Sequence, residues 1–486
     1  MQSRPAVLPQ LLLTAEKRKL CLIDGEKTLS YMELDSETSN FAHSLESLGV
    51  RKGDRVALFL PNCWQHVVSM YGALKLGAIC VPLDYRSTQR EIEFFLQNSK
   101  PTISVVSSSK SDLFPSNKIE VNPDSNSPIS ESFDSTQEHT VQQHDPALLL
   151  YTGGTTGFPK GVVLTHGNII HVLSGLSNAW RLRKGEEIFA QFLPMTHSGG
   201  LNCNLNSALY NGGTTLILRR FEASALLEQV ERLGITAFSG VPTIYNSLIR
   251  APDIENRDLS SLRLCFSSGA PLSPETADTF RKKTSITINV GWGLTEASPQ
   301  LTVAPLGIYR QNYVGIPIED TQVVALDEAL NRLPLGEIGE LAARGPQVMS
   351  SYHENEEETR KVFTRDGWLL TGDFGYVGTD GVYLIGRKKE VINTGGYKVW
   401  PSEVEGVLLE NELVLEACVV GVRDDYYGEA VKAFIVAKSA MSEQEILGFC
   451  KKRLSSYKVP KHIEFRTSLP KSSVGKILRR SLLTGP

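Results

Sequence analysis

The chain has 486 residues, of which 41% are hydrophobic and 21% are charged, with 40 glycines and 24 prolines. At roughly 150 residues per domain this length predicts two to four domains, and the composition excludes a disordered chain, a collagen and a long coiled coil. The formal charge is −4, but residues 387–486 carry 17 basic against 12 acidic side chains. This asymmetry is too mild for a nucleic-acid-binding protein, and it suggests that the C-terminal part meets an anionic ligand.

Cysteine usage and hydropathy indicate a cellular compartment. The seven cysteines are scattered without a C-x-x-C pair, so neither a disulfide framework nor a zinc ribbon is expected. No apolar run approaches the ~20 residues of a transmembrane helix, and the run at 11–13 is too short for the core of a signal peptide. These features favour a protein of the reducing cytoplasm.

Short apolar runs alternate with helix-period segments, which is typical of a mainly parallel α/β sheet. The first block predicts strands at 55–60, 78–83 and 102–106 and helices at 65–76 and 90–97. Residues 107–144 are rich in Ser, Asn, Asp and Pro, and they predict a surface excursion that carries no chemistry. The second block predicts strands at 188–193, 214–218, 236–238, 263–266 and 286–290, with helices at 223–233 and 274–283.

The pattern changes after the second block. Short strands with glycine turns predict a small antiparallel barrel at about 310–386. Beyond the basic triplet 387–389, a helix at 401–409, a strand at 417–422 and a capping box of Ser442 and Glu445 predict a small α+β domain. The predicted fold is therefore α/β, with a large domain at 1–388, made of two doubly wound subdomains and the barrel, and a C-terminal domain at 389–486.

The strongest local signal is the loop YTGGTTGFPKG at 151–161, which follows the apolar run 147–150. Glycines let backbone N–H groups converge on phosphate oxygens, hydroxyls add donors and a lysine adds a cation, so the loop predicts a polyphosphate cradle. It is not a Walker A loop, because a glycine and a β-type run follow its lysine. A glycine-rich hairpin turn is the alternative. The candidate phosphate-binding residues are Thr152, Gly153, Gly154, Thr155, Thr156, Gly157 and Lys160.

Four further motifs follow in order along the chain. They read GWGLTE at 291–296, TGD at 371–373, GRKKE at 386–390 with GGYK at 395–398, and PKSSVGK at 470–476. Together with the loop at 151–161 they resemble the adenylate-forming superfamily of acyl-CoA synthetases, peptide-synthetase adenylation domains and firefly-type luciferases. The resemblance covers nearly the whole chain and looks closest to the fatty acyl-CoA ligases. It implies a mobile C-terminal domain and the use of ATP, Mg²⁺ and coenzyme A.

The resemblance implies roles in nucleotide binding. Glu296 would ligate Mg²⁺, which prefers hard oxygen ligands, and Thr295 would contact the phosphates; a surface carboxylate and a turn-capping hydroxyl are the alternatives. Asp373 would bind the ribose hydroxyls and Arg387 the ribose and phosphate; a turn-forming aspartate and an interdomain ion pair are the alternatives. The resemblance also implies nucleotide binding by Trp292 and by an adenine-stacking loop that contains Gly269, Ala270 and Pro271. A strand-to-helix turn is the alternative for this loop.

The C-terminal motifs imply a domain movement. Lys476 would be delivered on its loop to the substrate carboxylate and the α-phosphate, as a catalytic cation; otherwise it is one of many basic C-terminal residues. Lys389 resembles the family's hinge. After the swing, Gly395 and Gly396 would form a narrow tunnel for a thiol arm, with Lys398 beside them. A β-hairpin turn is the alternative for the two glycines.

His197 is the remaining candidate in the acyl site. A lone histidine is more often structural, but in the resembling motif a histidine or aromatic side chain gates the acyl site. Small and apolar side chains around it would leave an elongated, mostly apolar pocket, into which an aryl acid would also fit. The candidate pocket residues are His197, Ser198, Gly200, Ser239, Val241, Phe266, Ser268, Gly291 and Trp292.

The sequence thus predicts a two-step ligase that converts a carboxylic acid, of the medium- or long-chain fatty acid class, to acyl-AMP and then to a coenzyme A thioester. The alternatives are an aryl-CoA ligase, an acyl-AMP ligase that loads a carrier protein, a luciferase-like oxygenase and a nucleotide sensor without enzyme activity. We expect no nucleic-acid partner, transient membrane contact for an apolar substrate, and a monomer or homodimer.

Overall fold

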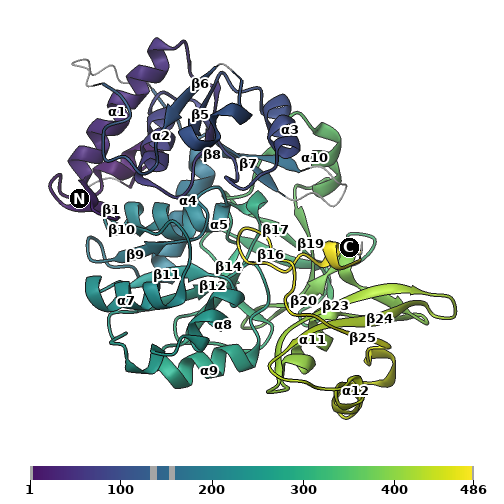
Figure 1. Cartoon of the computed structure of the whole chain (residues 1–486). Coiled ribbons are helices and arrows are strands. Elements are labelled where there is room, and N and C mark those ends of the chain that lie inside the picture. Colours follow the sequence, from purple (N-terminus) through teal and green to yellow (C-terminus); the bar gives the residue numbers. More distant parts are fainter. Residues whose placement is uncertain (1–3, 116, 132–139, 153–158, 484–486) are drawn as a thin grey trace.

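The computed structural model describes residues 4–115, 117–131, 140–152 and 159–483. Two large sheets and their covering helices form the N-terminal body, and a separate five-stranded sheet forms the C-terminal part (Figure 1). This confirms the predicted combination of a large mixed α/β part with a smaller C-terminal domain. All seven cysteines are free and buried. Within the described ranges, no helix is both long enough and apolar enough to cross a membrane.

The first sheet has seven strands in the order β18-β8-β7-β4-β3-β5-β6. The strands from β7 to β6 are parallel, whereas β8 and β18 are antiparallel to their neighbours. The inner strands are apolar runs because helices cover the sheet. The bounds are β3 (Arg55–Phe59), β4 (Ile79–Pro82), β5 (Ile103–Ser107), β6 (Lys118–Val121), β7 (Pro146–Thr152), β8 (Lys160–Thr165) and β18 (Ser351–Tyr352), with helices α2 (Trp64–Lys75) and α3 (Gln89–Ser99).

The segment 107–144 corrects one prediction. It was expected to be a surface excursion, but it contains a 3₁₀ helix, η2 (Ser108–Leu113), and the strand β6, which pairs in parallel with β5. β6 lies at the edge of the sheet, and Val121 is its one fully buried residue. An edge strand of this kind lacks the apolar run that marks an inner strand, so the sequence does not reveal it.

The second sheet has thirteen strands in the order β16-β17-β19-β20-β15-β14-β13-β12-β11-β9-β10-β1-β2. Strands β13 to β1 along this order form its parallel part. The bounds are β1 (Leu20–Asp24), β2 (Lys27–Ser30), β9 (Ile188–Gln191), β10 (Thr214–Ile217), β11 (Ala237–Gly240), β12 (Leu264–Ser267) and β13 (Ile288–Trp292), with helices α1 (Tyr31–Ser47), α4 (His166–Ala179), α5 (Ser198–Gly200), the π-helix η3 (Leu201–Asn206), α6 (Ser207–Tyr210), α7 (Ala223–Leu233), α8 (Pro242–Arg250) and α9 (Pro274–Thr284).

Residues 302–387 extend the second sheet with antiparallel strands. β14 pairs with β13 on one side and with β15 on the other, and β15 joins β20. β16 is the last strand of the sheet in the described residues and pairs with β17, so the region predicted as a small antiparallel barrel is an antiparallel extension of the second sheet. The bounds are β14 (Thr302–Val303), β15 (Tyr313–Pro317), β16 (Gln322–Leu326), β17 (Gly339–Arg344), β19 (Leu369–Gly378) and β20 (Gly381–Arg387), with helix α10 (Glu356–Val362).

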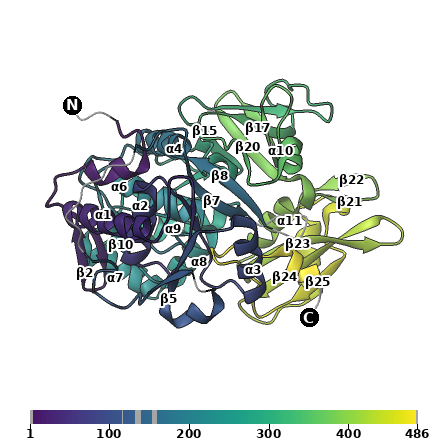
Figure 2. The same cartoon turned by 90° about the horizontal axis from the view of Figure 1, so that it is seen from above.

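The C-terminal sheet begins after the short 3₁₀ helix η6 (Lys388–Glu390) and has a hydrophobic core of its own. Figure 2 shows this sheet and the antiparallel extension as two neighbouring lobes beside the α/β body. Helix α12 starts at the capping box of Ser442 and Glu445, as the sequence predicts. The bounds are β21 (Ile392–Thr394), β22 (Tyr397–Val399), α11 (Pro401–Leu409), β23 (Val414–Asp424), β24 (Gly428–Ala437), α12 (Glu443–Lys451), η7 (Ser456–Lys458), β25 (His462–Phe465) and α13 (Arg479–Leu483).

Candidate active site

Parallel strands β11, β12 and β13 are neighbours in the second sheet, so their carboxyl ends lie at one edge. Ligand sites of open α/β sheets lie at this edge. The loop after β12 carries Gly269, Ala270 and Pro271, which are all exposed. The loop after β13 carries Thr295 and Glu296 in a short 3₁₀ helix, η5 (Thr295–Ala297). The structure therefore brings the predicted adenine and metal residues to the same edge.

The loop that carries Lys476 docks on this edge from the C-terminal part. Thr243 donates a hydrogen bond from Oγ1 to the carbonyl oxygen of Gly475 over 3.2 Å. Lys476 packs against Gly269, where a Cβ atom would lie 2.7 Å from its Cε. Burial lowers the pKa of the Lys476 ammonium, the charge of Arg387 lowers it further, and Asp373 opposes both. A loop about 200 residues away in sequence thus places an ammonium group beside the nucleotide candidates.

Asp373 and Arg387 face each other across the β19–β20 pair. Arg387 Nε lies 2.8 Å from Oδ1 of Asp373, and the indole N–H of Trp292 donates to Oδ2 over 2.7 Å. Asp373 is buried, and burial raises its pKa against the opposing effect of Arg387. The predicted ribose and phosphate residues therefore form one hydrogen-bonded unit, and Trp292 orients its carboxylate.

Glu296 and Lys160 meet through a residue that the sequence analysis did not select. The hydroxyl of Tyr352 donates to Oε1 of Glu296 over 2.7 Å, and Lys160 Nζ lies 5.0 Å from the centroid of the Tyr352 ring. Lys160 also forms an ion pair with Glu358 of α10. Hydrogen bonding to Lys160, and then to Lys361, lowers the pKa of Glu358 to about 2. No motif marks Tyr352 or Glu358, because β18 reaches β8 only by long-range pairing.

The phosphate loop itself is described at its two ends. Thr152 ends β7, Lys160 begins β8, and the two residues are partners in the antiparallel register. Gly153, Gly154, Thr155, Thr156 and Gly157 lie outside the described residues. Among the residues that are described, no three His, Cys, Asp or Glu side chains cluster as a metal site. A Mg²⁺ ion on Glu296 and the Thr295 hydroxyl would therefore need the oxygens of a bound nucleotide as further hard ligands.

His197 is the N-cap of α5, and its Nδ1 accepts a hydrogen bond from the Gly199 N–H over 3.2 Å. Burial, and then the positive charge of Lys476, lowers the pKa of His197 to about 4. The imidazole is therefore neutral at pH 7. His197 borders a cavity of about 100 Å³. The cavity is lined by Pro82, Leu83, Asp84, Phe95, Tyr151, Thr196, His197 and, from the Lys476 loop, Ser473.

Among the described residues, the other predicted acyl-pocket residues do not line this cavity, and most of them are buried. Gly291 is required for packing, since a Cβ there would lie 2.6 Å from Cζ of Phe266. Asn204 of the π-helix accepts from the Ser239 N–H over 2.7 Å. The buried members are Ser198, Gly200, Ser239, Val241, Phe266, Gly291 and Trp292, whereas Ser268 is partly exposed.

Gly395 and Gly396 form the turn between β21 and β22, and both have positive φ angles, +57° and +83°. Gly395 donates its N–H to the Tyr427 carbonyl over 2.9 Å, and Lys398 lies 3.8 Å from Glu328 of the antiparallel extension. The glycine turn and Lys398 thus contact Tyr427 and Glu328, whereas the Lys476 loop contacts Thr243 at the strand edge. Lys389 lies in η6, where burial and then the charge of Lys160 lower its pKa.

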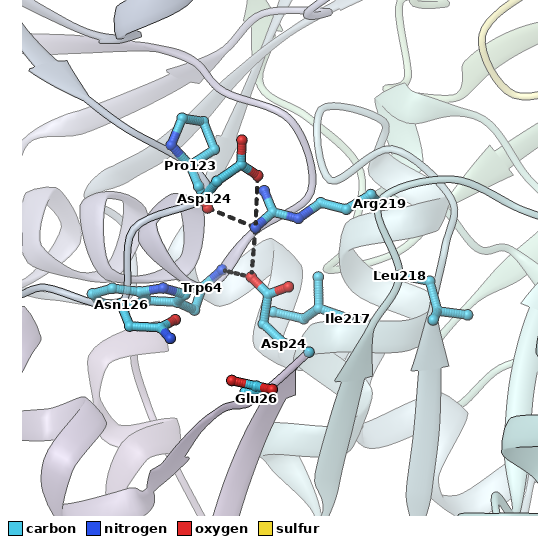
Figure 3. A pocket seen from close by; sticks show the side chains of 10 residues that line it. Asp24, Glu26, Trp64, Pro123, Asp124, Asn126, Ile217, Leu218 and Arg219 are labelled. Carbon is cyan, nitrogen blue, oxygen red and sulfur yellow. Dashed lines mark hydrogen bonds and ion pairs between the residues drawn. The ribbon is translucent and has the colours of Figure 1, made fainter.

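A larger cavity, of about 410 Å³, lies at the ends of β1 and β10 (Figure 3). The carboxylate of Asp24 accepts from the Trp64 N–H over 2.9 Å and pairs with Arg219 over 3.3 Å. Arg219 also donates to the Pro123 carbonyl over 2.6 Å. The segment 107–144, for which we expected no chemistry, supplies Pro123, Asp124 and Asn126 to its wall. Arg219 thus joins Asp24 to the Pro123 carbonyl in a network that ties the segment 107–144 to β1.

The chain belongs to the family of AMP-binding enzymes, whose pattern it matches over residues 13–353. The C-terminal domain of AMP-binding enzymes matches over residues 403–476. This confirms the resemblance drawn from the motifs.

Among its relatives, the long-chain-fatty-acid–CoA ligase of Bacillus subtilis (strain 168) is 37% identical, over 94% of this chain and 90% of the relative. The crystal structure of ATP-bound MatB from Rhodopseudomonas palustris is similar with a TM-score of 0.90 and 28% identity, over 98% of this chain and 97% of that one. A benzoate CoA ligase from Burkholderia xenovorans LB400 has a TM-score of 0.89 and 27% identity, over 98% and 99% of the two chains.

Proposed function

We propose that this enzyme activates a fatty acid with ATP to acyl-AMP and pyrophosphate, and then transfers the acyl group to the thiol of coenzyme A. The observation that carries the proposal is the position of Lys476. Its loop brings an ammonium group against Gly269 at the strand edge, where the charges of Arg387 and Asp373 also act on it. A protein that only binds nucleotide does not need a buried cation delivered from a second domain.

The first half-reaction would use charges that the fold already gathers. Lys476 would neutralise the carboxylate and the α-phosphate as negative charge develops between them. Lys160 would bind the outer phosphates, and Glu296 with Thr295 would hold Mg²⁺, which supplies Lewis-acid stabilisation of the phosphate oxygens when it is bound. Asp373 and Arg387 would bind the ribose, beside the adenine loop at 269–271.

The second half-reaction would require the C-terminal part to turn about Lys389. In the present orientation the Lys476 loop occupies the strand edge, whereas Lys398, next to the turn of Gly395 and Gly396, lies 3.8 Å from Glu328 of the antiparallel extension. One loop has to leave before the other can approach, so the two half-reactions would use different domain orientations.

The acyl group is proposed from the relatives and from the absence of basic residues in the predicted pocket. The Bacillus subtilis relative is named for long-chain fatty acids, and the Burkholderia xenovorans structure is named for benzoate. An aryl acid is therefore the second candidate. His197, which is neutral at pH 7, would close the acyl site without adding a charge to it.

A panel of straight-chain acids, benzoates and hydroxycinnamates tests the proposal. Pyrophosphate release and coenzyme A consumption are measured together. We also propose that the enzyme resides in the cytoplasm, so it is purified from the cytoplasmic fraction. Equal rates of pyrophosphate release and coenzyme A consumption with fatty acids support the proposal. Pyrophosphate release that stops after one turnover unless a carrier protein is added indicates the acyl-AMP ligase, and turnover of aryl acids alone indicates the aryl-CoA ligase. No pyrophosphate release with any acid indicates a nucleotide sensor.

A further inference from the structure

Tyr352 connects the two charged groups proposed for phosphate and metal binding. It is 6% exposed and lies in β18, where its register partner is Val162 of β8. Its hydroxyl is 2.7 Å from Oε1 of Glu296, and the centroid of its ring is 5.0 Å from Nζ of Lys160. One side chain therefore contacts both the carboxylate and the ammonium group.

The surroundings of Tyr352 fix its position. Its backbone N–H donates to Oγ1 of Thr359 over 3.0 Å, and the Met349 N–H donates to the Glu296 carbonyl over 2.7 Å. The main chain of Tyr352 and the main chain of Glu296 are thus each held by a further hydrogen bond. The hydroxyl is therefore held in place as the donor to Glu296.

We propose that Tyr352 is a positioning residue, whose hydroxyl orients Glu296 toward the metal and whose ring supports Lys160. The hydroxyl engages Oε1, and no hydrogen bond or ion pair joins Oε2 to the described residues. A glutamate that is partly exposed would otherwise sample several rotamers. Holding one oxygen fixes the carboxylate and leaves the other oxygen as the metal ligand. This inference rests on the proposed role of Glu296.

The ring acts on the other group. Lys160 is held between the Tyr352 ring and the carboxylate of Glu358, and its side chain is 15% exposed. A cation over an aromatic face is stabilised without consuming its hydrogen-bond donors. The ammonium group therefore keeps donors for phosphate while its position is restricted.

Equilibrium binding of ATP to the full chain, measured by calorimetry without any carboxylic acid, tests the proposal. The readout is the ratio of the ATP dissociation constants in EDTA and in excess Mg²⁺. Tyr352→Phe keeps the ring and removes the hydroxyl, so this ratio should fall about tenfold, while Mg²⁺-free ATP binding stays at the wild-type value. Tyr352→Leu should show the same fall and, having lost the ring, also bind Mg²⁺-free ATP about threefold more weakly.

Tyr31→Phe is the matched control, because Tyr31 is also buried and donates its hydroxyl to a carbonyl over 2.8 Å, that of Gly213. Its ratio should not change. Glu296→Gln should lose the Mg²⁺ preference, and adding Tyr352→Phe to it should cause no further loss. If Tyr352→Phe keeps the wild-type ratio of ATP dissociation constants while Glu296→Gln loses its preference for Mg²⁺, the positioning role of Tyr352 alone is overturned. A normal ratio in both variants removes the metal role of Glu296, and the inference with it.

Discussion

The docked Lys476 loop permits a prediction that separates the two half-reactions. Lys476→Ala removes the ammonium group, but the contact between Thr243 and the Gly475 carbonyl involves the backbone of the loop and remains. The loop should therefore still dock. Loss of one preorganised charge contact to a developing charge costs about 10²- to 10³-fold in rate, or about 3–4 kcal/mol. We expect acyl-AMP formation to fall by this factor, while supplied acyl-AMP and coenzyme A still give thioester at near the normal rate.

The opposite variant is Lys389→Pro, which fixes φ within η6. It should spare acyl-AMP formation in the present orientation and slow thioester formation, because the domain can no longer turn. Pyrophosphate exchange measures the first step, and thioester formation from supplied acyl-AMP measures the second. Lys471→Ala is the control in the same loop region, since Lys471 pairs with Glu416 over 2.7 Å and not with the proposed site.

One result would refute this reasoning. If Lys476→Ala and Lys389→Pro lost both half-reactions equally, with thermal unfolding midpoints like that of the wild type, a single fixed active site would replace domain alternation.

Three further predictions follow from particular residues. Gly269→Ala should slow acyl-AMP formation and spare thioester formation, because the new Cβ lies 2.7 Å from Cε of Lys476 at a φ of +84°. If the variant lost both half-reactions by the same factor relative to the wild type, or neither, this prediction would be wrong. Activity with straight-chain acids should rise by up to about 0.8 kcal/mol of transition-state binding per methylene until the pocket is full, and kcat/KM along the series measures this. Burial lowers the pKa of His66 from 6.5 to about 4. The unfolded state then binds more protons between these values, so the stability that depends on neutral His66 is complete above about pH 6.5 and falls as the pH drops toward 4. His66→Gln should flatten this slope by up to about one proton in urea unfolding curves, and an unchanged slope would remove His66 as the cause.

Local signals in the sequence determined much of the architecture. The helix predicted at 223–233 is α7, and it ends at Gly234, which has a φ of +65°. Helix α11 spans the predicted 401–409, and the capping box at Ser442 opens α12. Capping, glycine termination and apolar periodicity act within a few residues, so they can be read without the fold. The motifs also identified the family, because each motif is contiguous.

The tertiary structure alone decided which residues meet. β6 is half-exposed and shows no apolar run, and the strands after β13 continue the second sheet through the two-residue strand β14. Tyr352 lies 56 residues from Glu296, yet the pairing of β18 with β8 brings it to both Glu296 and Lys160. Contacts of this kind depend on the register of strands far apart in sequence, which local propensity does not encode. The same holds for Lys476, which reaches Gly269 only because one domain docks on the other.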